Sequence, residues 1–130
     1  MYEQTTRGIR VKVDPHYLED ESSPEDSRFV WAYTVRIENG SEDVVRLRGR
    51  RWLITDALGL TEEVVGDGVV GEQPVIRPGE GFEYTSGAPL GTPSGMMVGQ
   101  YEMETSGGET FDVEIPAFSL DSPHEYRQIH

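Results

Sequence analysis

The chain has 130 residues, which is the size of a single domain, and it contains no cysteine. The absence of cysteine excludes disulfide bridges, thiolate zinc sites and cysteine nucleophiles, and it fits a reducing compartment. The formal net charge of -13, from 24 acidic and 11 basic residues, opposes general attraction to nucleic acids and to anionic membranes.

No segment of the sequence is typical of a signal peptide or of a membrane span. Residues 1–13 contain no apolar run, and the chain nowhere approaches the roughly 20 consecutive apolar residues that cross a bilayer. We therefore expect a cytoplasmic protein that binds neither nucleic acid nor membrane. Residues 1–130 are expected to form one domain, with an acidic loop at residues 19–27 and a flexible polar tail at residues 121–130.

Apolar and polar residues alternate through most of the chain, which is typical of half-buried β-strands. The first alternation runs over residues 9–13. The clearest one ends at the turn signal Asn39-Gly40 and places five large apolar residues on one face: Phe29, Trp31, Tyr33, Val35 and Ile37.

A partner strand is predicted at residues 45–54, where the apolar phase changes partway. Val45 and Leu47 share an inward face with Trp52 only if one extra residue lies within residues 49–51. Such an insertion is a β-bulge.

Shorter strands separated by turns rich in glycine and proline are predicted further along, at residues 63–65, 75–76, 82–86, 97–103 and 111–115. The total of about seven strands predicts an all-β fold, an antiparallel β-sandwich of the fibronectin type III or immunoglobulin type. A small closed barrel is the competing architecture.

One loop, GDGVVGEQP at residues 66–74, contains three glycines within six residues. Gly66, Gly68 and Gly71 spell the pattern G-x-G-x-x-G, in which glycines let a backbone approach a pyrophosphate at a helix N-terminus. Here Pro74 and a strand follow instead of a helix, so a phosphate would need a nest of backbone N–H groups.

Two apolar residues of this loop and a row of arginines are the candidate contacts for a partner. The glycines can equally shape a strand connection, whose Val69 and Val70 pack inward or enter a partner's groove. Arg46, Arg48 and Arg50 share one sheet face at period two, where they can recognise an acidic peptide or a phosphate group. The competing interpretation is ion pairing with acidic residues on adjacent strands.

The sequence contains neither metal-ligand spacing nor a catalytic arrangement. The three histidines have no ligand spacing, so a zinc-type site is unsupported. The acidic residues 19–27 could hold magnesium only weakly, through water, and Asp56 is expected to cap a turn. No serine lies in a nucleophile elbow or beside a base, and no cofactor is expected.

In their order and spacing, several segments resemble the ApaG family. They are Trp52-x-Ile54-x-Asp56, the 66–74 loop, Pro78-Gly79-Glu80, Phe82-x-Tyr84-x-Ser86-Gly87, Thr92-Pro93-x-Gly95-x-Met97-x-Gly99-x-Tyr101 and Ile115-Pro116-x-Phe118-x-Leu120. The resemblance implies a fibronectin type III-like β-sandwich in a stand-alone, cytoplasmic bacterial protein. It also implies a link to cobalt tolerance and magnesium efflux without a settled biochemical activity, and similar eukaryotic domains are thought to mediate protein–protein contacts.

The sequence therefore predicts a non-enzymatic binding module that contacts another protein through a sheet face or through the 66–74 loop. The alternative is a phosphate- or nucleotide-binding protein that uses Gly66, Gly68 and Gly71. Weak binding of a divalent cation, and a homodimer formed by edge strands, are further expectations about partners.

Overall fold

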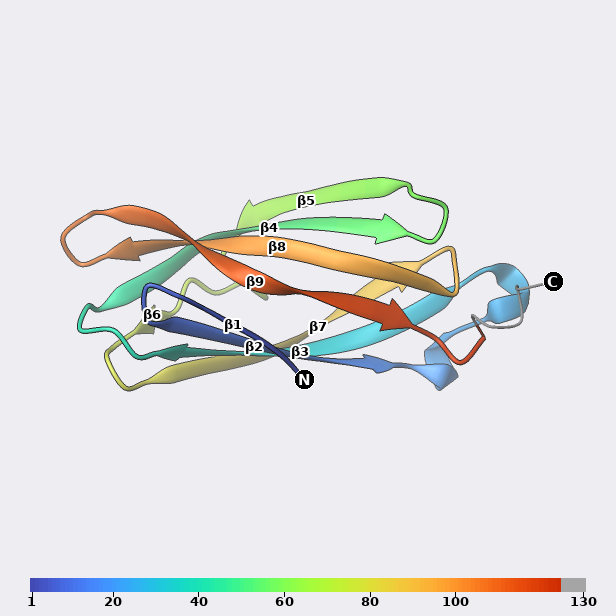
Figure 1. Ribbon diagram of the computed structural model, residues 1–130, viewed down its shortest axis with the longest axis horizontal. Helices are drawn as coiled ribbons and strands as arrows, with labels where there is room; N and C mark the ends of the chain where they lie inside the picture. The colour runs from blue at the N-terminus through green and yellow to red at the C-terminus, as the bar shows by residue number, and fades with distance from the viewer. Residues whose placement is uncertain (125–130) are drawn as a thin grey trace.

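The computed structural model describes residues 1–124 and shows two antiparallel β-sheets packed face to face (Figure 1). The strands of this described part, in chain order, are β1 (Tyr2–Thr6), β2 (Ile9–Tyr17), β3 (Phe29–Asn39), β4 (Val45–Asp56), β5 (Thr61–Asp67), β6 (Val75–Ile76), β7 (Gly81–Leu90), β8 (Ser94–Thr105) and β9 (Thr110–Asp121). Two short 3₁₀ turns, η1 (Glu19–Glu21) and η2 (Pro24–Asp26), follow β2.

The first sheet has the strand order β1-β2-β3-β7, and the second has the order β5-β4-β8-β9, with β6 also pairing with β4. At one side of the sandwich β9 contacts β1 and β2, which covers the sheet edges there. Strands β5 and β7 end their sheets at the other side, and in the described chain each pairs with a single neighbouring strand. The two separate sheets confirm the predicted sandwich and decide against the closed barrel.

The core lies between the sheets and follows the predicted alternation. The five large apolar residues that alternate from Phe29 to Ile37 in β3 were expected to face inward, and each is at most 5% exposed. Trp52 packs edge-on against Tyr33 and Phe118, with ring centroids 5.5 and 5.9 Å apart. Such aromatic pairs add about 0.5–1.5 kcal/mol to the stabilisation from buried area, so Trp52 joins the two sheets at the centre of the core.

The described chain forms nine strands rather than about seven. Strand β1 was not predicted because its sequence, YEQTT, has no apolar alternation and its three middle residues are exposed. Backbone pairing with β2 adds β1 to the first sheet. Tyr2 of β1 also packs against the core, with its ring 5.9 Å from that of Phe118.

The acidic segment and the start of the tail are held by specific contacts. Within residues 19–27, the Ser22 hydroxyl donates to the Leu18 carbonyl at 2.8 Å and accepts from the Val30 N–H at 2.9 Å. At the start of the predicted tail, Asp121 ends β9, and Ser122 is 6% exposed, with its N–H donating to the Pro93 carbonyl at 3.0 Å. The rest of the predicted tail, residues 125–130, lies outside the described residues.

The packing of Trp52 gives a direct test of the core. Gly99 lies opposite Trp52, and a Cβ at Gly99 would sit 2.5 Å from the Arg51 carbonyl oxygen and 2.8 Å from the indole. We predict that Gly99→Ala lowers the free energy of unfolding by about 1–3 kcal/mol, the usual cost of overpacking, as measured by urea denaturation.

The matched control is Gly107→Ala, whose Cβ would meet no atom closer than 3.8 Å. It should change the free energy of unfolding by no more than about 0.5 kcal/mol. Equal losses in the two variants would contradict this account of the core.

Candidate functional site

A β-bulge in β4 decides which arginine faces the interior. The β4–β8 ladder pairs Leu47 with Met103 and then Gly49 with Glu102, so Arg48 is the extra residue. The sequence predicted the extra residue within residues 49–51, one position later. Beyond the bulge the inward face of β4 carries Arg50 as well as Trp52, and Arg50 lies opposite the buried Tyr101.

Arg50 holds the beginning of the glycine loop. Its Nη1 donates to the carbonyl oxygens of Asp67 and Gly68, each at 3.0 Å. The guanidinium lies against Gly66, where a Cβ would sit 2.7 Å from Nη1. Hydrogen bonds to a charged donor are the stronger ones, so this half-buried side chain ties β5 and the loop to β4.

The predicted stripe of three arginines on one face is therefore incorrect. Arg46 and Arg48 are exposed on the outer face of the second sheet, whereas Arg50 points the other way because the bulge reverses the phase of β4. Arg48 pairs with Glu104 at 3.6 Å, and Arg51 pairs with Glu63 of β5. Exposed ion pairs of this kind contribute about 0–1 kcal/mol each.

Each glycine of the loop has a conformational or steric role. Gly66 makes room for Arg50. Gly68 has φ of 60°, and a Cβ there would lie 2.1 Å from the Glu72 carbonyl oxygen. Gly71 has φ of 82° and follows Val70 in a tight turn whose two central residues both have positive φ.

Backbone hydrogen bonds within the loop use several of the N–H groups that an anion would need. The N–H of Val69 donates to the Glu72 carbonyl at 2.8 Å, and the N–H of Glu72 donates back at 2.9 Å. The Gly68 N–H donates to the Arg48 carbonyl at 2.9 Å. The loop continues into strand β6, as the sequence predicted, and the three glycines shape this connection.

The two valines of the loop have opposite environments. Val69 is fully buried in the core, which corrects the expectation that it forms an exposed contact, and Val70 is 52% exposed at the tip. Val70 has φ of 43°. A β-branched residue rarely adopts this left-handed conformation, which costs an L-residue about 1–2 kcal/mol.

A buried pair of tyrosines joins the sheets beside Arg50. The hydroxyls of Tyr84 on β7 and Tyr101 on β8 share a hydrogen bond. Burial raises the pKa of Tyr101 well above its usual value, and burial likewise raises the pKa of Tyr84. Both hydroxyls therefore stay protonated at neutral pH and serve as a fixed link between the sheets.

An apolar patch lies on the outer face of the second sheet. Half-buried Leu53 of β4 pairs across the ladder with Val98 of β8, and Met96 follows on the same face. These three residues, called the outer apolar patch below, line a hollow of about 440 Å³. Met96 and Val98 are 48% and 38% exposed. The pairing of Leu53 with Val98 follows from the strand register, which no single segment of the sequence shows.

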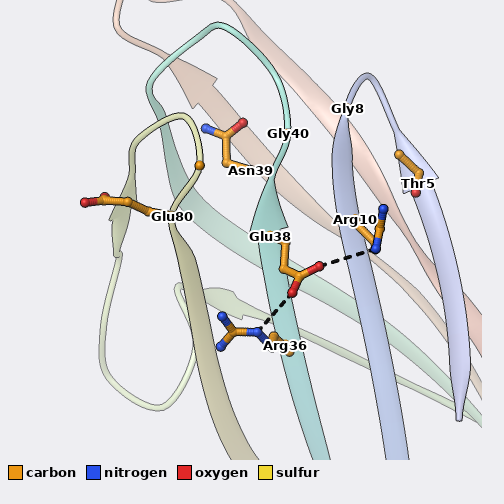
Figure 2. A pocket seen from close by; sticks show the side chains of 9 residues that line it. Thr5, Gly8, Arg10, Arg36, Glu38, Asn39, Gly40 and Glu80 are labelled. Atoms are coloured by element: carbon orange, nitrogen blue, oxygen red, sulfur yellow. Dashed lines mark hydrogen bonds and ion pairs between the residues drawn. The ribbon is translucent and has the colours of Figure 1, made fainter.

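A polar hollow of about 460 Å³ lies on the first sheet, near the turns that follow β1 and β3. Figure 2 shows Arg10 and Arg36 on either side of Glu38, with ion pairs to it drawn as dashed lines. None of these residues was predicted from the sequence as part of a site. They could have been predicted from the outward-facing positions of β2 and β3, where charged residues alternate with core residues.

Two findings concern acidic side chains. Among residues 1–124 no three His, Asp or Glu side chains lie close enough together to hold a metal ion, and the acidic residues 19–27 are no exception. Asp56 caps a turn as predicted, because its Oδ1 accepts the N–H groups of Leu58 and Leu60 at 2.9 and 3.0 Å.

The fold and these surfaces define a small immunoglobulin-like β-sandwich protein. No helix within residues 1–124 has the length and apolar character needed to cross a membrane. Residues 19–105 match the family model described as the ApaG domain.

The chain is 62% identical over 130 residues to Protein ApaG of Parvibaculum lavamentivorans, covering 100% of both chains. It is 65% identical over 125 residues to Protein ApaG of Paramagnetospirillum magneticum, covering 96% of each. A crystal structure of the ApaA protein of Bordetella pertussis, 42% identical, matches with a TM-score of 0.86 over 95% of this chain and 98% of that one. The chain therefore belongs to the ApaG family, as its motifs indicated.

The conformation of Val70 leads to a prediction about stability. Asn tolerates positive φ and is favoured before glycine in such turns, so Val70→Asn should raise the free energy of unfolding by about 1 kcal/mol in urea denaturation. The control, Val65→Asn, changes an exposed valine in β5 and should leave stability equal or lower, because strands favour β-branched residues. A loss of stability in Val70→Asn would contradict the strained turn.

Proposed function

We propose that this protein is a non-enzymatic protein-binding module. It presents the outer face of its second sheet and the tip of its glycine loop to a partner protein. The observation that carries the proposal is the distribution of exposed apolar side chains over the molecule.

The large exposed apolar residues are concentrated on one sheet. Apart from Met1, all those in the described chain belong to the second sheet or to the loops that connect its strands: Leu58, Leu60, Val65, Val70, Val75, Met96 and Val98. Scattered apolar residues are normal on a protein surface, but a concentration on one face is typical of an interaction site. In a chain of net charge -13 the contrast with the rest of the surface is strong.

Two of the predicted arginines can add specificity to this face. Arg46 and Arg48 are exposed on the same side of the second sheet, at the end where β6 pairs with β4. They would meet acidic groups of a partner at the rim of the apolar contact. Arg50 and Val69 support this surface from inside, since Arg50 anchors the loop and Val69 belongs to the core.

The conformation of Val70 supports a contact at the loop tip. An exposed valine with positive φ stabilises the free protein less than asparagine would at the same position. Strained residues often lie where function requires a particular side chain. Contact between Val70 and a partner gives a physical reason for valine here.

The experiment compares proteins retained from lysate by the wild type and by three tagged variants, each checked for an unchanged circular dichroism spectrum. Val98→Asp places a charge in the outer apolar patch, and Val70→Asn removes the apolar tip. Thr85→Asp places the same charge on the exposed outer side of β7 in the first sheet and is the matched control.

We predict that Val98→Asp and Val70→Asn each lower retention of a defined partner by about tenfold or more, as expected for residues at the centre of an interface, while Thr85→Asp retains it. An identical set of bound proteins for Val98→Asp and Thr85→Asp would contradict the proposal.

The alternative predicted from the sequence, phosphate or nucleotide binding at Gly66, Gly68 and Gly71, is not needed to explain these glycines, since each has a role within the loop. Calorimetry with pyrophosphate and ATP separates the two functions, because heat that disappears in Gly68→Val would favour the alternative. A cytoplasmic location, weak binding of a divalent cation, and a homodimer through the edges of β5 or β7 remain predictions.

A further inference from the structure

Two cationic side chains, Arg10 and Arg36, line the polar hollow on the first sheet together with one carboxylate, and Lys12 reaches that carboxylate from beside the hollow. Glu38 lies 3.6 Å from Arg10, 3.4 Å from Lys12 and 3.1 Å from Arg36. Its two oxygens are shared among the three, since Oε1 meets Arg10 and Lys12 and Oε2 meets Arg36. The guanidinium and ammonium groups therefore keep donors that Glu38 does not use.

The positive charge at this place exceeds what the neighbouring carboxylates neutralise. Lys12 and Arg36 are directly opposite in the β2–β3 ladder, and like charges in that position repel. Glu83 approaches Arg36 only to 3.9 Å, and Glu3, opposite Lys12 on β1, forms no ion pair with it within 4.0 Å. Three cations thus stand against the two carboxylates, Glu38 and Glu83, that form ion pairs with them.

The other acidic residue that lines the hollow is turned away from the cations. In Figure 2 the side chain of Glu80 points out from its turn, away from Arg36 and Glu38. Its Oε1 accepts the backbone N–H of Arg77 at 3.0 Å, which fixes it within its own turn. Glu38 is therefore the one lining carboxylate that contacts the cations.

Backbone hydrogen bonds fix the rim of the hollow in advance. The N–H of Gly40 donates to the Gly8 carbonyl at 2.8 Å, and the N–H of Gly79 donates to the Asn39 carbonyl at 2.7 Å. The amide of Asn39, which is 2% exposed, donates to the carbonyls of Asp43 and Ile76. Three turns are thus joined into one rim, and ligand entry would require little ordering of the backbone.

Arg36 is itself held in place. Its guanidinium lies over Gly81 of β7, where a Cβ would come within 2.9 Å of Nη2. Its Nε contacts Glu38 and its Nη1 lies 3.9 Å from Glu83, so the planar group keeps further N–H donors for an anion at this side of the hollow.

We propose that this polar hollow binds a phosphate dianion, either free or as the phosphate group of a small phosphorylated molecule. The two guanidinium groups that line the hollow, with Lys12 beside them, offer more donors than the two oxygens of a carboxylate accept, and a tetrahedral phosphate brings further oxygens. Glu38 occupies the position between the two guanidinium groups in the free protein and moves aside when phosphate enters. This site is separate from the glycine loop and does not depend on the proposed protein-binding surface.

The experiment follows the backbone amide and arginine Nε–H signals of the full-length protein by NMR during titration with inorganic phosphate at low ionic strength. The expected shifts are at Arg10, Arg36, Gly40 and Gly79. Titration with phosphoserine reports on a phosphorylated small molecule, and succinate is the carboxylate dianion for comparison.

Three variants make the test specific. Arg36→Gln should weaken phosphate binding by about tenfold or more, as expected for the loss of a charge-assisted hydrogen bond. Glu38→Gln should strengthen it severalfold by removing the competing carboxylate. Arg46→Gln removes an exposed arginine of the second sheet and should bind as the wild type does.

Several results would overturn the proposal. They are shifts confined to residues 66–74, equal phosphate binding by Arg36→Gln and Arg46→Gln, weaker binding by Glu38→Gln, succinate binding as tight as phosphate, or no shift at millimolar phosphate. Phosphoserine binding that exceeds binding of free phosphate would identify the source of the phosphate group as a phosphorylated molecule.

Discussion

The hydrogen bonds made by the inward-facing Arg50 are the interaction on which the β5 edge of the second sheet depends. One extra residue in β4, Arg48, reverses the phase of the strand and brings a charged side chain to the inner face. A charge at such a position is costly unless it is hydrogen-bonded, and the carbonyls of Asp67 and Gly68 satisfy it. The same contact holds the start of the loop, two residues before its exposed tip at Val70.

The two outer faces of the sandwich have different chemistry although they share one core. The second sheet carries the outer apolar patch and most of the exposed valines, whereas the corresponding face of the first sheet carries Arg10, Lys12, Arg36 and Glu38. The Tyr84–Tyr101 hydrogen bond and the packing of Trp52 tie the sheets together. One core in this way carries two outer surfaces that face in opposite directions and differ in their chemistry.

Much of the fold could be predicted because its signals are local. The alternation in residues 29–37 identified the central strand and its buried face, and Asn39-Gly40 marked its end. The need for Trp52 to face inward indicated the bulge to within one residue. The family resemblance agreed with these patterns, since its motifs include the loop at residues 66–74 and the aromatic strand positions.

The rest depends on contacts between strands that no single segment reveals. The orientation of Arg50 follows from the position of the bulge, and the burial of Val69 follows from the way the loop folds back onto Glu72. Strand β1 has no apolar pattern of its own and was therefore missed. The polar hollow forms only when the register places Arg10 beside Glu38, which lies 28 residues further along the chain.

The most direct test of this account is amide hydrogen exchange in Arg50→Gln. If Arg50 holds the loop, exchange at the N–H groups of Val69 and Glu72 should accelerate by about tenfold or more, while Val35 in the central strand keeps its protection. Arg46→Gln is the matched control and should exchange as the wild type does. Equal protection of Val69 and Glu72 in the two variants would contradict the claim that the bulge and its inward arginine organise the loop.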